Sequence, residues 1–279
     1  VSRRNYRMSF MRPPQVQKVS AGKRILLTLV AFIVAFAAML PQFTVIVTSF
    51  LKTKGPLFVA GFSLDSYRQI GFKLSKNIMN TFLFSSIAIV LMILLGLLLS
   101  YIVVRRTSKL APFLDASAMF PYVIPGAVIG IGLVTAFNKP PLLLTGTMAI
   151  LIVSYIIRKL PFILRSSTAI LQQIDPSIEE ASISLGVPPM KTFFKTTAIL
   201  MIPGLISGGI LSWVSTINEL SSTLILYAGN TGTIPVAIFN EIFKDSFGTA
   251  AALASILSFA TVISLVIFNK VSGGRSVLM

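Results

Sequence analysis

Six long apolar runs, separated by short polar segments, constrain this chain more than any other feature. The first run, Ile25 to Phe50, exceeds the roughly 20 residues that a helix needs to cross a bilayer, which also argues against a cleaved signal peptide. Hydrophobic residues make up 54% of the sequence and charged residues 11%, a composition suited to lipid and not to water. The sequence therefore predicts an all-α integral membrane protein.

The positions of the basic residues predict how the chain is oriented. The predicted crossings are Ile25 to Phe50, Asn77 to Val104, Pro112 to Phe137, Leu142 to Leu164, Ile202 to Tyr227 and Phe247 to Phe268. Most of the 24 basic residues lie on one face, and Arg105, Arg106 and Lys109 close the second crossing there. At the inner end of the fourth crossing, Arg158, Lys159 and Arg165 can reach the lipid headgroups. Because basic loops stay in the cytoplasm, we expect both termini there. The chain then divides into a basic segment 1–24, a transmembrane domain 25–270 and a tail 271–279.

Residues that the sequence lacks exclude several function classes. The chain has no cysteine and no histidine, which excludes thiol redox chemistry, Cys/His metal sites and histidine acid–base catalysis, so we expect no enzyme. It also lacks the phosphate loop GxxxxGK followed by Ser or Thr. The net charge of +16 comes from residues between apolar runs, not from a basic face with aromatic residues, so we expect no nucleic-acid partner.

Prolines and glycines mark two irregular regions. Pro121 and Pro125 with Gly126 fall inside the third crossing and remove backbone hydrogen bonds, which predicts a kinked or broken helix. Gly126, Gly130 and Gly132 form a small-residue stripe that indicates close helix packing or, alternatively, a flexible pathway wall. Between the first two crossings, Leu64, Tyr67 and Ile70 have helical spacing, so we expect a short helix in that external segment.

A polar island from Asp175 to Lys195 interrupts the apolar runs. Asp175 is a suitable N-cap, and Pro176 with Glu179 and Glu180 suits the first turn of a helix. Gly186 can adopt the left-handed conformation that ends a helix. Pro188 and Pro189 can open a second one, which would carry Met190, Phe193 and Phe194. The island therefore predicts a helix, a tight corner and another helix.

Within this island, Glu180-Ala181-Ser182, followed by Gly186, resembles the EAA loop of permease subunits of binding-protein-dependent ABC importers. The family pattern continues with Ile-x-Leu-Pro, where this chain has Thr196 to Ile199, and the next proline is Pro203. The resemblance covers about 77–273, and its flanking segments are most similar to the ferric-iron branch, with phosphonate permeases close behind.

This resemblance implies a type I importer permease in a bacterial cytoplasmic (inner) membrane, with loop 175–195 contacting ATPase subunits. The residues implied to couple to the ATPase are Glu179, Glu180, Ala181, Ser182, Gly186, Met190, Phe193 and Phe194. The implied partners are a second permease subunit, identical or related, two ATPase subunits that bind ATP and Mg, an external solute-binding protein and membrane lipid. The chain itself would need no cofactor. In this family the pathway lies between two six-crossing bundles, so a single EAA-like loop and no visible internal repeat imply that this chain would form half of a pathway.

Glu219 is the acidic residue that hydropathy places inside a membrane segment. A carboxylate there costs a few kcal/mol, so it normally faces a cavity or a partner. It could line the substrate pathway or be a hydrogen-bonded structural group, and in the structural role we expect glutamine to be tolerated at this position but leucine to cause misfolding. No metal ligation follows from either role. The candidate pathway residues are Glu219, Asn218, Ser221, Ser222, Pro121 and Pro125.

The leading prediction is a permease subunit of an ATP-driven importer, for ferric iron delivered by a solute-binding protein. An aminoalkylphosphonate or another small solute is the alternative cargo. Two alternatives of other classes remain open: a secondary transporter that uses Glu219 as an ion-coupling site, and a structural membrane-assembly subunit.

Overall fold

The computed structural model describes residues 20–106 and 110–271, so most of the predicted basic segment 1–24 and nearly all of the tail 271–279 lie outside the described residues. The helices are α1 Ala21–Ser49, α2 Asp65–Lys73, α3 Ser75–Arg105, α4 Leu110–Val123, α5 Gly126–Ala136, α6 Met148–Gln173, α7 Ser177–Ser184, α8 Pro189–Thr192, α9 Ala198–Ile217, α10 Thr223–Leu226, α11 Ile234–Phe243 and α12 Phe247–Val271. A π-helical turn η1 (Phe193–Thr197), a 3₁₀ turn η2 (Gly229–Thr231) and strands β1 (Leu51–Lys54) and β2 (Leu57–Phe62) complete the chain.

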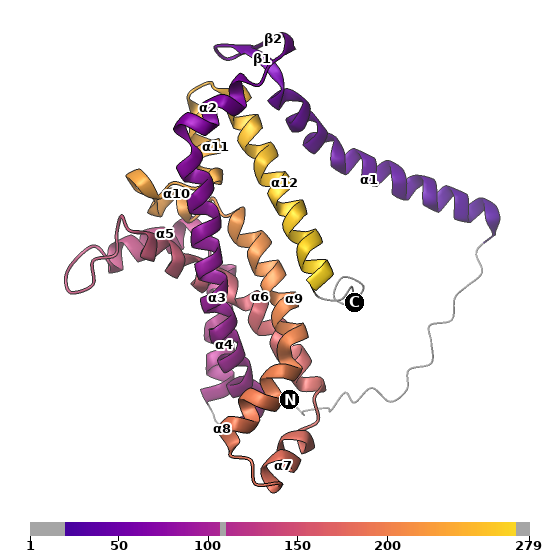
Figure 1. The fold of residues 1–279 in the computed structure, drawn as a ribbon, viewed down its shortest axis with the longest axis vertical. Coiled ribbons are helices and arrows are strands. Elements are labelled where there is room, and N and C mark those ends of the chain that lie inside the picture. Colours follow the sequence, from indigo (N-terminus) through magenta and orange to yellow (C-terminus); the bar gives the residue numbers. More distant parts are fainter. Residues whose placement is uncertain (1–19, 107–109, 272–279) are drawn as a thin grey trace.

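Helices α3, α6 and α9 form the centre of an elongated bundle (Figure 1). Buried side chains such as Met92 of α3, Leu151 and Tyr155 of α6 and Met201 of α9 belong to one hydrophobic cluster. Glycine lets α6 and α9 approach closely, since a Cβ on Gly208 would lie 2.6 Å from the Cα of Ile163. The core is thus held by close backbone packing, as the small-residue patterns of membrane helices favour.

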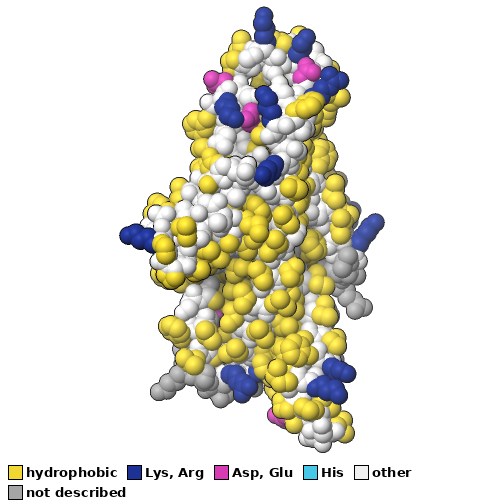
Figure 2. All heavy atoms as spheres, turned by 60° about the vertical axis from the view of Figure 1, so that its left-hand side comes forward, with side chains coloured by type: hydrophobic (Ala, Val, Ile, Leu, Met, Phe, Trp, Pro, Cys, Tyr) yellow, Lys and Arg dark blue, Asp and Glu magenta, His cyan; other side chains and the backbone are white. Residues whose placement is uncertain are grey.

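Helix α1 leaves the bundle at a wide angle (Figure 1). Among the described residues, α1 contacts the bundle through its C-terminal part, where Gln42 hydrogen-bonds Ser258 of α12, and most apolar side chains along α1 are exposed. Figure 2 shows a broad hydrophobic surface over the middle of the bundle, with many of the charged side chains toward its two ends. This distribution is that of a membrane-spanning protein.

The six predicted crossings correspond to α1, α3, the pair α4–α5, α6, α9 and α12. By length and composition, the described residues provide four membrane-spanning helices, or five if α4 and α5 count as one span. Helix α6 is long enough but carries Arg158, Lys159 and Arg165, so the count of six stays a prediction. The predicted break in the third crossing is confirmed, because α4 and α5 meet at an angle of 110° between Val123 and Gly126.

The fifth crossing is shorter than predicted. A single helix to Tyr227 was expected, but α9 ends at Ile217 and the chain turns away from its axis through residues 218–222. The side chain of Glu219 accepts the backbone N–H of Ser222, which competes with helix continuation. Apolar residues on both sides of this turn conceal the end of the helix in a hydropathy pattern.

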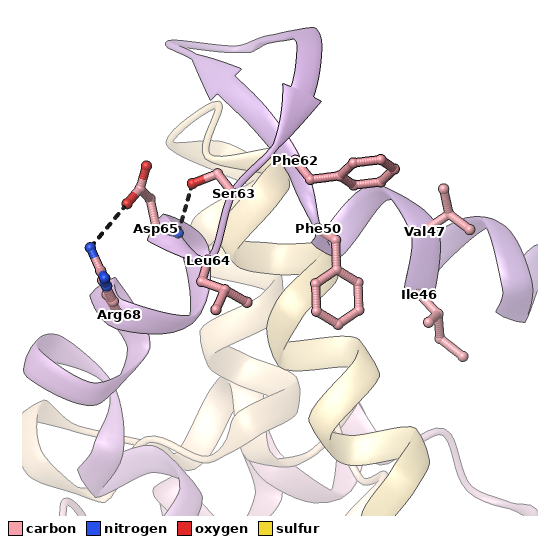
Figure 3. Close-up of a pocket in the computed structure, with 8 residues that line it drawn as sticks. All are labelled: Ile46, Val47, Phe50, Phe62, Ser63, Leu64, Asp65 and Arg68. Carbon is pink, nitrogen blue, oxygen red and sulfur yellow. Dashed lines mark hydrogen bonds and ion pairs between the residues drawn. The ribbon is translucent and has the colours of Figure 1, made fainter.

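The external segment between the first two crossings contains the predicted short helix, α2, and an antiparallel β1–β2 hairpin that was not predicted. Gly55 has φ +62° in the turn of this hairpin. Figure 3 shows an apolar groove between the end of α1, the hairpin and the start of α2. It is lined by Ile46, Val47, Phe50, Phe62, Ser63, Leu64, Asp65 and Arg68. The groove lies at the opposite end of the bundle from α7 (Figure 1).

Candidate functional site

Segment 175–195, hereafter the corner segment, has the predicted helix–corner–helix form. The Asp175 carboxylate accepts the N–H of Ser177 at 3.0 Å, where α7 begins. At the other end of α7, Gly186 has φ +87° and donates its N–H to the carbonyl of Ile183 at 2.9 Å. Helix α8 then begins at Pro189, which needs no N–H partner at that position. Figure 1 places this corner at one end of the bundle.

An ion pair attaches α7 to the end of α3. The Arg105 Nε lies 2.9 Å from Glu179 Oε1, and both side chains are only 12% exposed. Tyr101 also donates to Glu179, at 3.2 Å, while Arg105 Nη2 donates to the carbonyl of Ile174 at 3.0 Å. Glu179 is therefore an internal anchor and is not available to a docking partner. Sequence reasoning treated Arg105 only as a topology signal, because its partner is 74 positions away.

The remaining predicted coupling residues divide between the inside and the outside of the corner. Ser182 bonds Thr192 at 3.0 Å and braces α7 against α8, while Phe193 is buried edge-on against Tyr101. The other five face solvent: Glu180, Ala181, Gly186, Met190 and Phe194. With the exposed apolar residues Ile178, Ile183 and Leu185, they form what we call the corner surface. This surface is the part of the segment that another protein could contact.

The missing Ile-x-Leu-Pro does not interrupt the chain's path after the corner. Helix α8, the π turn η1 and α9 follow one another without a break from Pro189 to Ile217. A single π turn accommodates one extra residue within a helix, and the helix continues beyond it. The corner is consequently connected directly to the region of Glu219.

Gly186→Val is expected to impair coupling more than folding. A Cβ at this position would meet nothing within 4 Å, so the cost, roughly 1–2 kcal/mol, arises from the positive φ alone. The substitution should redirect α8 and reduce both uptake and substrate-stimulated ATP hydrolysis in the reconstituted transporter. Gly71→Val, in open space at an ordinary φ, is the control. Wild-type coupling in Gly186→Val would show that the corner geometry is not needed.

A second polar site surrounds Glu219, which is 5% exposed. Its Oε1 pairs with Arg158 Nη1 and its Oε2 lies 2.7 Å from Lys159 Nζ. The N–H and hydroxyl of Ser222 also donate to Oε1, at 3.1 and 3.3 Å. We call Arg158, Lys159 and Glu219 the buried ion cluster. The prediction that Arg158 and Lys159 reach the headgroups was wrong, because α6 continues to Gln173 and both cations turn inward to Glu219.

The break between α4 and α5 lies against this cluster. A Cβ on Gly126 would come within 2.6 Å of Arg158 Nη1 and 2.8 Å of Ser221 Oγ. Of the predicted pathway residues, the fold thus brings Ser221, Ser222 and Glu219 together beside Pro125, which caps α5. Asn218 is exposed and donates to its own helix at Val214, and Pro121 lies inside α4. Whether these residues line a pathway stays a prediction.

The described residues contain no group of three or more His, Cys, Asp or Glu side chains that could hold a metal ion. The buried ion cluster can therefore act through its electrostatic field. It fixes two cationic groups in the interior of the bundle, near the middle of α6.

Residues 92–273 match the family model described as the binding-protein-dependent transport system inner membrane component. The chain belongs to this family. It is therefore a non-catalytic, multi-pass component of an inner-membrane transport system, with the fold class of type I importer permeases.

Among known relatives, the chain is 33% identical over 197 residues to a ferric transport system permease of Actinobacillus pleuropneumoniae, a match that covers 71% of this chain and 29% of that protein. It is 27% identical over 164 residues to a putative 2-aminoethylphosphonate permease of Salmonella paratyphi A, covering 59% and 62%. The chain thus spans about three tenths of the ferric relative.

A solved bacterial alginate ABC transporter, in complex with its alginate-bound periplasmic protein, contains a chain with the same fold. The TM-score is 0.70 at 17% identity, and the match covers 91% of this chain and 96% of that one. At this identity the likeness concerns the fold alone.

Proposed function

We propose that this chain forms half of the translocation pathway of an ATP-driven type I importer. Its partners in this proposal are a second permease subunit, two ATPase subunits, an external solute-binding protein and the surrounding lipid. The observation that carries the proposal is the corner segment, which presents exposed apolar side chains on a support anchored by Arg105 and Glu179. Family membership supports the same assignment.

In this mechanism, ATP binding closes the ATPase pair and moves the corner surfaces of the two permease subunits together. Two connections carry that movement into this chain. The Arg105–Glu179 pair transmits it to α3, and the continuous path from α8 through η1 transmits it to α9. Helix α9 ends beside the buried ion cluster, so the movement reaches the residues that we assign to the pathway. ATP and Mg are bound by the ATPase subunits, since this chain has no phosphate loop.

Ferric iron delivered by a solute-binding protein is the proposed cargo, because the ferric permease of A. pleuropneumoniae is 33% identical to this chain. An aminoalkylphosphonate is the second candidate, supported by the Salmonella relative. A secondary transporter coupled through Glu219 is disfavoured by family membership and by the ion pairs that occupy both carboxylate oxygens.

Glu180→Lys tests the docking role of the corner surface. Glu180 is exposed in the first turn of α7, so a lysine there opposes the helix dipole by only about 0.3–1 kcal/mol and inverts a charge on the proposed contact. We expect an inserted, folded protein that no longer co-purifies with its ATPase subunits and shows almost no uptake. Asp65→Lys is the matched control, because Asp65 occupies the first turn of α2 near the opposite end of the bundle. Normal ATPase association in Glu180→Lys would refute the docking assignment.

A further inference from the structure

The buried ion cluster contains more positive than negative charge. Arg158 and Lys159 both pair with the single carboxylate of Glu219, and no other acid of the described residues forms an ion pair with either cation. Their side chains are 16% and 10% exposed, so water screens this excess charge only weakly. Burying a net positive charge is energetically unfavourable unless an anion lies beside it and neutralises it.

The guanidinium of Arg158 also has an unused donor. Its Nε is buried and has no hydrogen-bond partner among the described residues. Buried polar atoms of this kind are rare and call for an explanation, such as a ligand that the chain alone does not supply. Both oxygens of Glu219 are already in use, so the carboxylate does not provide it.

Gly126 makes room for the guanidinium against the start of α5, since a Cβ at this position would lie 2.7 Å from Arg158 Cζ. Gly126 is also the first residue of α5, whose N-terminal dipole adds positive potential at the same point. The flanking residues Pro125 and Ser221 are exposed, so the guanidinium lies just beneath an accessible surface. Ser221 can add a hydroxyl donor.

We propose that this cluster is a selectivity site that binds an oxyanion group of the cargo, with Arg158 as the contacting residue. Glu219 then acts as the fixed counter-charge that holds Arg158 and Lys159 in place. The inference rests on the proposed function and narrows its substrate class. The cargo carries a phosphonate, sulfate-like or carboxylate group, either as a free anion or as the ligand shell of a metal complex. A bare ferric ion is repelled at this site.

The test uses the full chain, without ATPase subunits, in lipid nanodiscs. Sulfate is the probe, and chloride at equal ionic strength is the reference. We expect sulfate to raise the melting temperature of the wild type beyond the effect of chloride, because a ligand that binds the folded state stabilises it. Arg158→Gln should weaken the apparent sulfate affinity by about 10- to 100-fold, the loss of one charge-assisted hydrogen bond. Arg165→Gln, which removes a half-exposed arginine of the same helix, should keep the wild-type response.

If Arg158→Gln does not fold, Arg158→Lys serves as the test variant. It retains the ion pair with Glu219 but lacks the guanidinium fork, so its apparent sulfate affinity should fall by less than that expected for Arg158→Gln. The proposal would be overturned if sulfate and ferric citrate both gave the same response as chloride in the wild type. It would also be overturned if the response to the stabilising probe were unchanged in the Arg158 variant that folds. Ferric citrate, used as the probe in place of sulfate, distinguishes a free anion from the ligand shell of a metal complex. If the metal complex stabilises and sulfate does not, the oxyanion belongs to a ligand shell.

Failure of the proposed function has a different signature. It would appear in the assembled transporter as absent substrate-stimulated ATP hydrolysis, whatever the nanodisc result.

Discussion

Glu219→Leu is expected to destabilise the folded protein by about 3–5 kcal/mol, because it leaves two buried cations without their common partner. Glu219→Gln should also destabilise it, by less, since the amide can still accept from Ser222 but cannot neutralise Arg158 or Lys159. Thermal unfolding in nanodiscs, followed by the fraction of monodisperse protein, measures both effects.

The matched control is Glu241→Leu. Glu241 is 8% exposed, but its partner Lys244 has a side chain that is 65% exposed and can be hydrated after the substitution. Its cost should therefore be clearly smaller than that of Glu219→Leu. If both leucine variants unfold at the same temperature, the buried ion cluster does not depend on Glu219. The cluster also changes the expectation from the sequence, in which a structural Glu219 would tolerate glutamine.

Arg105→Ala is expected to abolish most transport while the bundle stays folded. The substitution frees Glu179 and the carbonyl of Ile174, so α7 loses its attachment to α3 and ATPase movement no longer reaches the bundle. Uptake and substrate-stimulated ATP hydrolysis should both fall in the reconstituted transporter. Arg106→Ala is the control, because Arg106 is the adjacent residue and is exposed.

A double-mutant cycle tests whether Arg105 and Glu179 act through their interaction with each other. Arg105→Ala and Glu179→Ala should each reduce transport, and their combination should reduce it little further, with a coupling free energy of about 0.5–3 kcal/mol. Additive losses would mean that the two side chains act separately and that α7 is attached by other contacts. Conversely, if Arg105→Ala matches Arg106→Ala in uptake, the attachment has no role in coupling.

The features that could be predicted from the sequence alone depend on residues that are close together along the chain. The corner of segment 175–195 follows from Asp175 before the first turn, Gly186 at a positive φ and Pro189 at the start of α8, and each acts within one helical turn. The break between α4 and α5 follows in the same way from Pro125 and Gly126. Local backbone chemistry is sufficient in these places, because no distant partner is needed to select the conformation.

Tertiary structure decided what the charged residues do. In the sequence, Arg105, Arg158 and Lys159 have the same appearance, as cations near apolar runs, and all three were interpreted as signals of topology. Their partners lie 74, 61 and 60 positions away, and only the packing of α3 against α7 and of α6 against the turn after α9 brings them together. The physical reason is that a charge in an apolar environment is stable only beside its counter-charge, and one-dimensional hydropathy records the charge without its partner.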